Sequence, residues 1–216
     1  LDNLSNPASR AAAVGGDRQV LFVGLGTMGL PMARNLLRAG WAVTGYDRLD
    51  DARRAFAEAG GRVVTDPAEA AAAADVVITM VPDDRAIRDV LALPDGLLGV
   101  MRPGALVIEM STTAPSTKQA LAAMAAQRGV DFVESPVGKT MEAAIAGTLT
   151  LMVAGAPAAI ERARPILAPM GNEVHVCGAM GAASAIKLIN NALVACINAA
   201  SSAGSRPASS TMAMTA

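Results

Sequence analysis

Two short segments of the sequence have the composition of phosphate-binding loops. Residues 24–29 read GLGTMG, which has the G-x-G-x-x-G spacing of a dinucleotide-binding turn. Residues 138–140 read GKT, the end of a P-loop, in which Lys contacts phosphate and Thr binds magnesium. The two segments predict different ligands, a dinucleotide or a nucleoside triphosphate, so the surrounding residues decide between them.

The surroundings of the first segment fit a dinucleotide. It follows an apolar run typical of a buried strand and opens a segment of helical periodicity, 27–40. Gly24 permits the tight turn, Gly26 lets a pyrophosphate approach the backbone, and Gly29 lets helix and strand pack closely. The N-terminus of the helix would then offer N–H groups to the phosphates.

A carboxylate at the end of the second predicted strand indicates which dinucleotide binds. Asp47 lies eighteen residues after Gly29, where it can bind both ribose hydroxyls and would repel a 2′-phosphate. NAD is therefore favoured over NADP. The neighbouring Arg48 could accommodate a 2′-phosphate, which keeps NADP as the alternative.

The surroundings of GKT do not fit a P-loop. The first glycine of the motif would have to stand at Val133, and Pro136 lacks the N–H that a phosphate cradle uses. Glu134 is also poorly suited to phosphate. We therefore expect these residues to serve another purpose, or to form an ordinary solvated loop.

Hydride transfer at a carbonyl carbon requires a proton at its oxygen, and one lysine is a candidate donor. Lys187 and Asn191 are four residues apart in an apolar helical segment, so both point the same way from it, and Asn198 extends the stripe. Burial beside a nicotinamide would lower the pKa of this lysine toward neutrality. A solvated helix edge is the alternative. His175, the only histidine, lies in an apolar strand and is more typical of a structural residue.

The elements that must position these residues alternate along the chain, as in an α/β fold with a doubly wound, Rossmann-type, mostly parallel sheet. We predict an extension over 1–18, a dinucleotide-binding domain over 19–180, a long apolar helix over 181–203 and a disordered tail over 204–216. Strands are predicted over 19–24, 41–47, 62–64, 75–81, 104–110, 130–135, 148–155 and 172–178, and further helices over 27–40, 49–61, 66–74, 83–92, 115–129 and 157–171.

The composition excludes several classes of protein. Of the 216 residues, 52% are hydrophobic, which can form a core, while 2% are aromatic and the net charge is −1, which argues against nucleic-acid and anionic-membrane surfaces. The sequence contains no run of 18 apolar residues, so no transmembrane helix is predicted. Two cysteines make no disulfide framework and favour a reduced, cytoplasmic setting. No metal site is expected.

Four segments together resemble the β-hydroxyacid dehydrogenase family, which includes 3-hydroxyisobutyrate dehydrogenase, over about residues 19–203. They are GLGTMGLPMARNLLRAG, like its cofactor loop; MSTTAPST, like its S-T-x-x-P substrate motif; SPVGKTMEAAIAGTLTLMVAG, like its substrate loop and G-T-L-T strand; and GAASAIKLINN, like its catalytic helix. The resemblance implies an NAD-dependent enzyme that interconverts a small anionic hydroxy acid and its semialdehyde.

The resemblance also implies roles for individual residues. Lys187 would be the general acid/base, and Asn191 would orient it or hold the substrate. Ser111 and Thr112 would lie beside the nicotinamide and the substrate. Gly138, Lys139 and Thr140 would line the pocket for the acid group. The cofactor-binding residues would be Gly24, Leu25, Gly26, Thr27, Met28, Gly29, Asp47, Arg48, Val81 and Pro82.

The sequence departs from most family members at the substrate loop. Where they read P-V-S-G-G, residues 136–140 read PVGKT, similar to the P-V-G-R-T of the sulfolactaldehyde reductase branch. A Lys and a Thr suit a sulfonate, although Lys lacks the bidentate fork of Arg. We therefore expect GKT to bind the acid group of the substrate, either a sulfonate or a carboxylate.

A second departure concerns the end of the chain. Family members continue into an all-helical C-terminal domain that closes the active site and builds a dimer, whereas the resemblance ends at about Ala203. We therefore expect this domain to be absent and the apolar helix to favour a homo-oligomer or self-association. Two functions stay open: an active NAD-dependent reductase or dehydrogenase, and a truncated cofactor-binding remnant without turnover.

Overall fold

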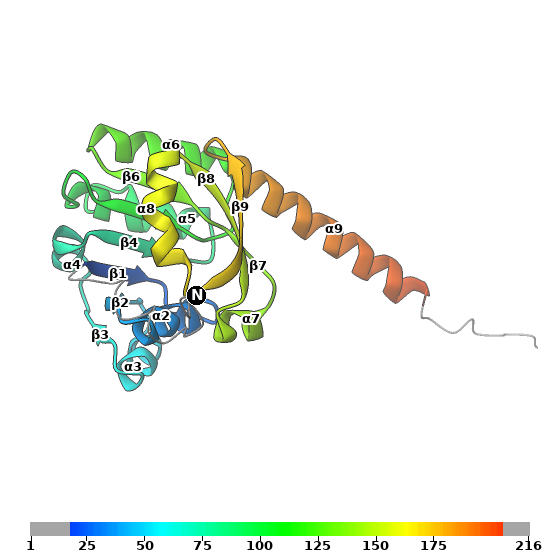
Figure 1. Ribbon diagram of the computed structural model, residues 1–216, viewed down its shortest axis with the longest axis horizontal. Coiled ribbons are helices and arrows are strands. Elements are labelled where there is room, and N and C mark those ends of the chain that lie inside the picture. Colours follow the sequence, from blue (N-terminus) through cyan, green and yellow to red (C-terminus); the bar gives the residue numbers. More distant parts are fainter. Residues whose placement is uncertain (1–17, 205–216) are drawn as a thin grey trace, which may run out of the picture.

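The first strand shows why this sequence forms a sheet that is covered on both sides. In β1 (Gln19–Val23), Val20 and Phe22 belong to one hydrophobic cluster, and Leu21 and Val23 belong to another. Because successive side chains of a strand point to opposite faces, four successive buried apolar residues require cover on both faces of the sheet. The computed structural model, which describes residues 18–204, has helices on both faces of this strand (Figure 1).

The elements alternate in the described part of the chain much as the sequence predicts. The strands are β1 (Gln19–Val23), β2 (Ala42–Tyr46), β3 (Arg62–Val63), β4 (Val76–Thr79), β5 (Leu106–Glu109), β6 (Asp131–Glu134), β7 (Val137–Gly138), β8 (Leu149–Gly155) and β9 (Gly171–Gly178). The helices are α2 (Gly29–Arg38), α3 (Asp50–Glu58), α4 (Ala68–Ala73), α5 (Asp84–Leu91), α6 (Pro115–Gln127), α7 (Met141–Ala146), α8 (Pro157–Leu167) and α9 (Ala182–Gly204), with a 3-10 turn, η1 (Leu97–Gly99).

The sheet has the strand order β3-β2-β1-β4-β5-β6-β8-β7, and β9 pairs with β8. The six strands from β3 to β6 in this order are parallel, while β8 is antiparallel to β6 and β7 and parallel to β9. The prediction of a doubly wound, mostly parallel sheet is thus confirmed. In such sheets ligands bind outside the carboxyl ends of the strands, where the order reverses. Here the reversal lies between β1 and β4.

Each face of the sheet has its own hydrophobic cluster. On one face, buried residues of α2, α3 and α8 pack against the strands, including Leu36, Phe56 and Ile160. On the other face, α4, α5 and α6 pack against them, with Ile87 and Leu121 among the buried residues. The helices therefore hold the strands from both sides and leave the carboxyl ends of the strands to the connecting loops.

Helix α9 extends away from the α/β body (Figure 1). Its first turn is buried at Ala183 and Ser184, whereas the large apolar side chains beyond it are 40–62% exposed. These are Ile186, Leu188, Ile189, Leu193, Val194 and Ile197. By length and composition alone, Ala182–Ser202 could cross a membrane, with a mean hydropathy of 1.3. The sequence predicted no such span, since Lys187 and three asparagines leave no run of 18 apolar residues there.

Two predicted segments lie almost entirely outside the described residues, and two small elements were not predicted. The predicted extension, apart from Arg18, and the predicted tail, apart from Gly204, lie outside the described residues. The sequence did not predict β7 and α7. The strand β7 has two residues and forms by antiparallel pairing with β8, a long-range contact that leaves no periodic pattern in so short a segment.

Candidate active site

The glycine turn between β1 and α2 has the shape that a dinucleotide needs. A Cβ on Gly24 would overlap the carbonyl oxygen of Met80, and one on Gly29 would overlap the carbonyl of Gly24. Gly26 differs, because a Cβ there would meet no atom within 4 Å, and both it and Thr27 are exposed. Packing therefore explains the first and third glycines, while the open space at Gly26 fits the approach of a ligand.

At the start of α2, Leu30 N donates to Gly26 O at 3.0 Å and Pro31 has no N–H, so the donors that would serve the ligand are Gly29 N and the glycine turn before it. Met28, at the N-cap position, makes no side-chain capping bond, and the first turn contains no acidic residue. Such a helix end carries unpaired N–H donors and a partial positive charge, which suit a pyrophosphate. The residues present thus fit the phosphates of a dinucleotide.

Asp47 follows β2 and lies against the same turn. Its Oδ2 accepts a hydrogen bond from Leu25 N at 2.8 Å, and its Oδ1 accepts one from Leu49 N at 2.9 Å. A carboxylate has about four lone-pair sites, so two remain for ribose hydroxyls. Arg48 is exposed. The structure therefore joins Asp47 to the glycine turn through Leu25, as the predicted cofactor site requires.

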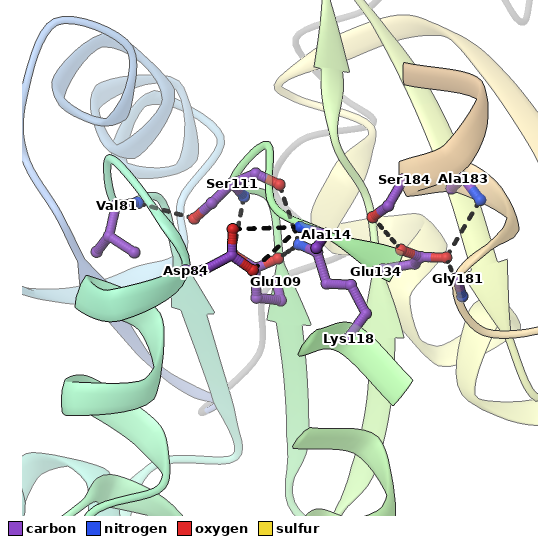
Figure 2. Close-up of polar contacts among 10 residues, drawn as sticks. All are labelled: Val81, Asp84, Glu109, Ser111, Ala114, Lys118, Glu134, Gly181, Ala183 and Ser184. Atoms are coloured by element: carbon purple, nitrogen blue, oxygen red, sulfur yellow. Dashed lines mark hydrogen bonds and ion pairs between the residues drawn. The ribbon is translucent and has the colours of Figure 1, made fainter. Parts of the chain in front are cut away.

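Ser111 lies in the loop after β5 and is fully buried. Its hydroxyl accepts a hydrogen bond from Val81 N at 2.9 Å, so it links this loop to the loop after β4 (Figure 2). Ser111 N donates to Glu109 Oε1 at 2.9 Å. Thr112 is half-buried and Pro82 is exposed. The structure thus brings Val81 and Ser111 together, with the serine hydroxyl already engaged by the backbone.

Sequence reasoning missed a buried ion pair beneath this loop. Lys118 and Glu109 are both fully buried and form an ion pair, and Lys118 Nζ also donates to Ser111 O at 2.9 Å (Figure 2). Burial lowers the pKa of Lys118 to about 7, and the carboxylates of Glu134 and Asp84 oppose that shift. The sequence did contain a signal, because Lys118 shares the helical stripe of two buried residues, Leu121 and Ala125.

The predicted acid-group residues lie on the turn between β7 and α7. Lys139 has a left-handed backbone, with φ at +76°, and its Nζ donates to Thr148 O and pairs with Glu173 Oε1, each at 2.9 Å. The hydroxyl of Thr140 lowers the pKa of Glu142 through a hydrogen bond. The Lys139 ammonium and the Thr140 hydroxyl are exposed, and each is bonded to a carboxylate. Solvent screens an exposed ion pair, so an anion could compete with Glu173 for Lys139.

The proton-donor candidates lie on α9. Lys187 is half-buried, and burial lowers its pKa from the ordinary value of 10.5. Asn191 is exposed one turn further along the helix. No hydrogen bond or ion pair among residues 18–204 joins either side chain to the two loops described above. His175, expected to be structural, is largely exposed on β9, with Nε2 3.9 Å from Glu173 Oε2.

Two neighbouring strand ends connect these loops to α9. Glu109 and Glu134 are register partners at the ends of β5 and β6. Glu109 binds the Ser111 loop, and Glu134 accepts hydrogen bonds from the start of α9 (Figure 2).

No group of three or more His, Cys, Asp or Glu side chains in the described part of the chain could hold a metal ion.

The chain is similar to a known protein family and to several known proteins. Residues 19–193 match the model for the NAD binding domain of 6-phosphogluconate dehydrogenase. The chain is 39% identical to NAD-dependent L-serine dehydrogenase of Pseudomonas aeruginosa, with 82% of the chain and 60% of the relative covered. It is also 39% identical to 3-sulfolactaldehyde reductase of Escherichia coli, with 84% and 61% covered.

A solved structure is also similar to this chain. Mycobacterium tuberculosis 3-hydroxyisobutyrate dehydrogenase, in a structure with L-serine, has a TM-score of 0.78 and 38% sequence identity. The match covers 82% of this chain and 60% of that protein. The chain thus spans about 60% of the length of these three relatives.

Proposed function

The chain belongs to the β-hydroxyacid dehydrogenase family and carries its NAD-binding domain, and we propose that it serves an NAD-dependent interconversion of a small anionic 3-hydroxy acid and its semialdehyde. One observation carries this proposal. Three parts of the proposed site lie at the carboxyl ends of parallel strands of one sheet. The cofactor turn follows β1 and is bonded to Asp47 after β2, and the Ser111 loop follows β5. The start of the helix that bears Lys187 is bonded to Glu134 at the end of β6.

Bound NADH would supply the hydride to the carbonyl carbon of the semialdehyde. The chain's own residues perform the remaining work. Gly26 and the N-terminus of α2 would hold the phosphates, and Asp47 would hold the ribose. The Lys187 ammonium would donate a proton to the carbonyl oxygen as the alcohol forms, and solvent would then reprotonate the amine.

Asp47 should set the preference for NAD over NADP. Replacing Asp47 by Asn keeps an acceptor near Leu25 N but removes the charge that repels a 2′-phosphate. We expect the ratio of the NADPH to the NADH dissociation constant to fall by about tenfold, since one hydrogen bond to a charged group contributes about 1.5–3 kcal/mol. Fluorescence titration of both cofactors measures this ratio. Tighter binding of NADPH than NADH to the unmodified chain would contradict the assignment.

The acid group of the substrate would bind at Gly138, Lys139 and Thr140. The similarity of PVGKT to the substrate loop of sulfolactaldehyde reductases supports a sulfonate as the finer proposal, and a carboxylate is the alternative. In either case Lys139 must exchange Glu173 for the substrate anion. A cytoplasmic location and a homo-oligomer stay predictions.

Removing the Lys139 side chain should weaken binding of charged substrates selectively. We expect Lys139→Ala to raise KM for an anionic semialdehyde about tenfold, the low end of the range for a hydrogen bond to a charged group, because the side chain is exposed. An uncharged aldehyde of similar size should show less than a twofold change. The matched control is Glu173→Gln, which removes the competing carboxylate and should not raise KM for the anion. An equal rise in KM for both aldehydes in Lys139→Ala would show that Lys139 is an ordinary loop residue and does not bind the acid group.

A second candidate function is cofactor binding without turnover. It is favoured by α9, where Lys187 lies just beyond the buried first turn and the following apolar side chains are exposed. Exposure of this kind also favours self-association. NADH titration together with a steady-state assay distinguishes the two candidates, because both predict binding and only the first predicts substrate-dependent NADH oxidation.

A further inference from the structure

Glu134 is the last residue of β6, and its buried carboxylate faces the start of α9 (Figure 2). Its Oε1 accepts hydrogen bonds from Gly181 N at 2.6 Å and from Ala183 N at 3.1 Å. Its Oε2 accepts one from the Ser184 hydroxyl. Three donors from one helix end therefore converge on one carboxylate that is 47–50 residues away in sequence.

These contacts satisfy both partners. The first N–H groups of a helix have no partner within the helix, and a buried carboxylate is costly unless it accepts hydrogen bonds. A negative charge at a helix N-terminus is also stabilised by the helix dipole. Glu134 therefore fixes the first turn of α9 with charge-assisted hydrogen bonds, which are stronger than neutral ones.

The first turn is where α9 is attached to the α/β body. Gln119 of α6 donates from Nε2 to Met180 O at 3.2 Å, and a Cβ on Gly181 would lie 2.9 Å from that same nitrogen. Gly181 has a left-handed backbone, with φ at +97°. Beyond Ser184 the large apolar side chains of α9 are exposed. The direction of the helix is therefore set mainly by its first turn.

Lys187 lies three residues after Ser184, so it moves with that turn. With a rise of about 1.5 Å per residue and a long side chain, its amine lies about 10 Å from the attachment point, and a tilt of about 10° would displace it by roughly 2 Å. A misplacement of about 1 Å in a reacting group can cost about 10²-fold in rate.

We propose that Glu134 is a positioning residue for proton transfer, which acts through the orientation of α9 on Lys187; this rests on the proposed role of Lys187. Glu109, its register partner, binds the Ser111 loop. The ends of these two paired strands thus hold the Ser111 loop and the first turn of α9.

The test uses Glu134→Gln in the full 216-residue chain, with Ser184→Ala as a milder variant that removes one of the three donors. We expect Glu134→Gln to lower kcat at least tenfold and Ser184→Ala to lower it severalfold, with the NADH dissociation constant within twofold of the unmodified chain. In a Lys187→Ala background, Glu134→Gln should change the residual kcat by less than twofold, because its effect passes through Lys187. A further tenfold loss in that background would show general loosening and overturn the proposal.

An arm independent of turnover measures hydrogen exchange of backbone amides. Glu134→Gln should raise the exchange rate at Gly181 and Ala183 and in the following turn about tenfold or more, while exchange in β1 and β4 stays unchanged. Unchanged exchange in α9, or an unchanged kcat in a chain whose Lys187→Ala variant is impaired, would overturn this inference alone. A Lys187→Ala variant with unchanged kcat would instead overturn the proposed function.

Discussion

Replacing Lys187 by Ala is expected to lower kcat for semialdehyde reduction by about 10²-fold or more while leaving NADH affinity nearly unchanged. In the proposed function the amine acts on the reacting oxygen and takes no part in the phosphate and ribose contacts, which would lie at the start of α2 and after β2. Steady-state kinetics at saturating NADH, together with fluorescence titration, measure the two quantities separately. An alanine variant with an unchanged kcat would refute the role.

The matched control is Lys187→Arg, which keeps the positive charge but loses the ability to release a proton, since the pKa of Arg exceeds 12. A kcat as low as that of the alanine variant indicates proton transfer, whereas a largely retained kcat indicates that only the charge matters. The pH profile gives a further check. Because burial lowers the pKa of Lys187 below 10.5, kcat for reduction should fall as pH rises through that lowered value, while kcat for oxidation should rise.

Below pH 7, where Lys118 with its pKa of about 7 carries its charge, replacing Lys118 by Met is expected to destabilise the fold by about 3–5 kcal/mol, because it leaves the carboxylate of Glu109 buried without its cation. The same change removes the hydrogen bond to Ser111 O, so the loop at the predicted nicotinamide site should also loosen. Urea denaturation measures the free energy of unfolding. A loss of less than about 0.5 kcal/mol would show that the pair contributes little.

The control for this prediction is the double variant Glu109→Gln with Lys118→Met. It removes both charges and keeps an oxygen that can accept from Ser111 N. Since removing a whole buried ion pair is often close to neutral, the double variant should recover most of the lost stability. Additive losses from the two single changes would instead assign the effect to packing.

The sequence predicted the elements whose pattern repeats over a long segment. The apolar run of β1 and the G-x-G-x-x-G spacing predicted the strand, the turn and the helix after it, because both patterns lie within one short segment of the chain. The exposed apolar side chains of α9 were also expected from their distribution around the helix. These features depend on neighbouring residues along the chain and can therefore be read from it.

The features that the sequence did not predict depend on contacts between distant segments. Glu134 was considered only as a residue unsuited to a phosphate loop, yet its partners lie 47–50 residues later. Lys118 was read as part of an ordinary helix, and its pairing with Glu109 requires β5 and α6 to be packed together. Lys139 was expected to face an anionic substrate, and its contact with Glu173 on β9 could not be foreseen from the GKT segment.

The most direct test of the proposed function is NADH oxidation by the full 216-residue chain against a panel of aldehydes with carboxylate, sulfonate or no acid group. We predict saturable binding of NADH and oxidation that depends on an anionic semialdehyde. The rate should be below the roughly 10 s⁻¹ of a typical enzyme, because the helix that carries Lys187 is attached mainly through its first turn. Tight NADH binding without substrate-dependent oxidation across the whole panel would contradict it and leave cofactor binding without turnover as the function of this chain.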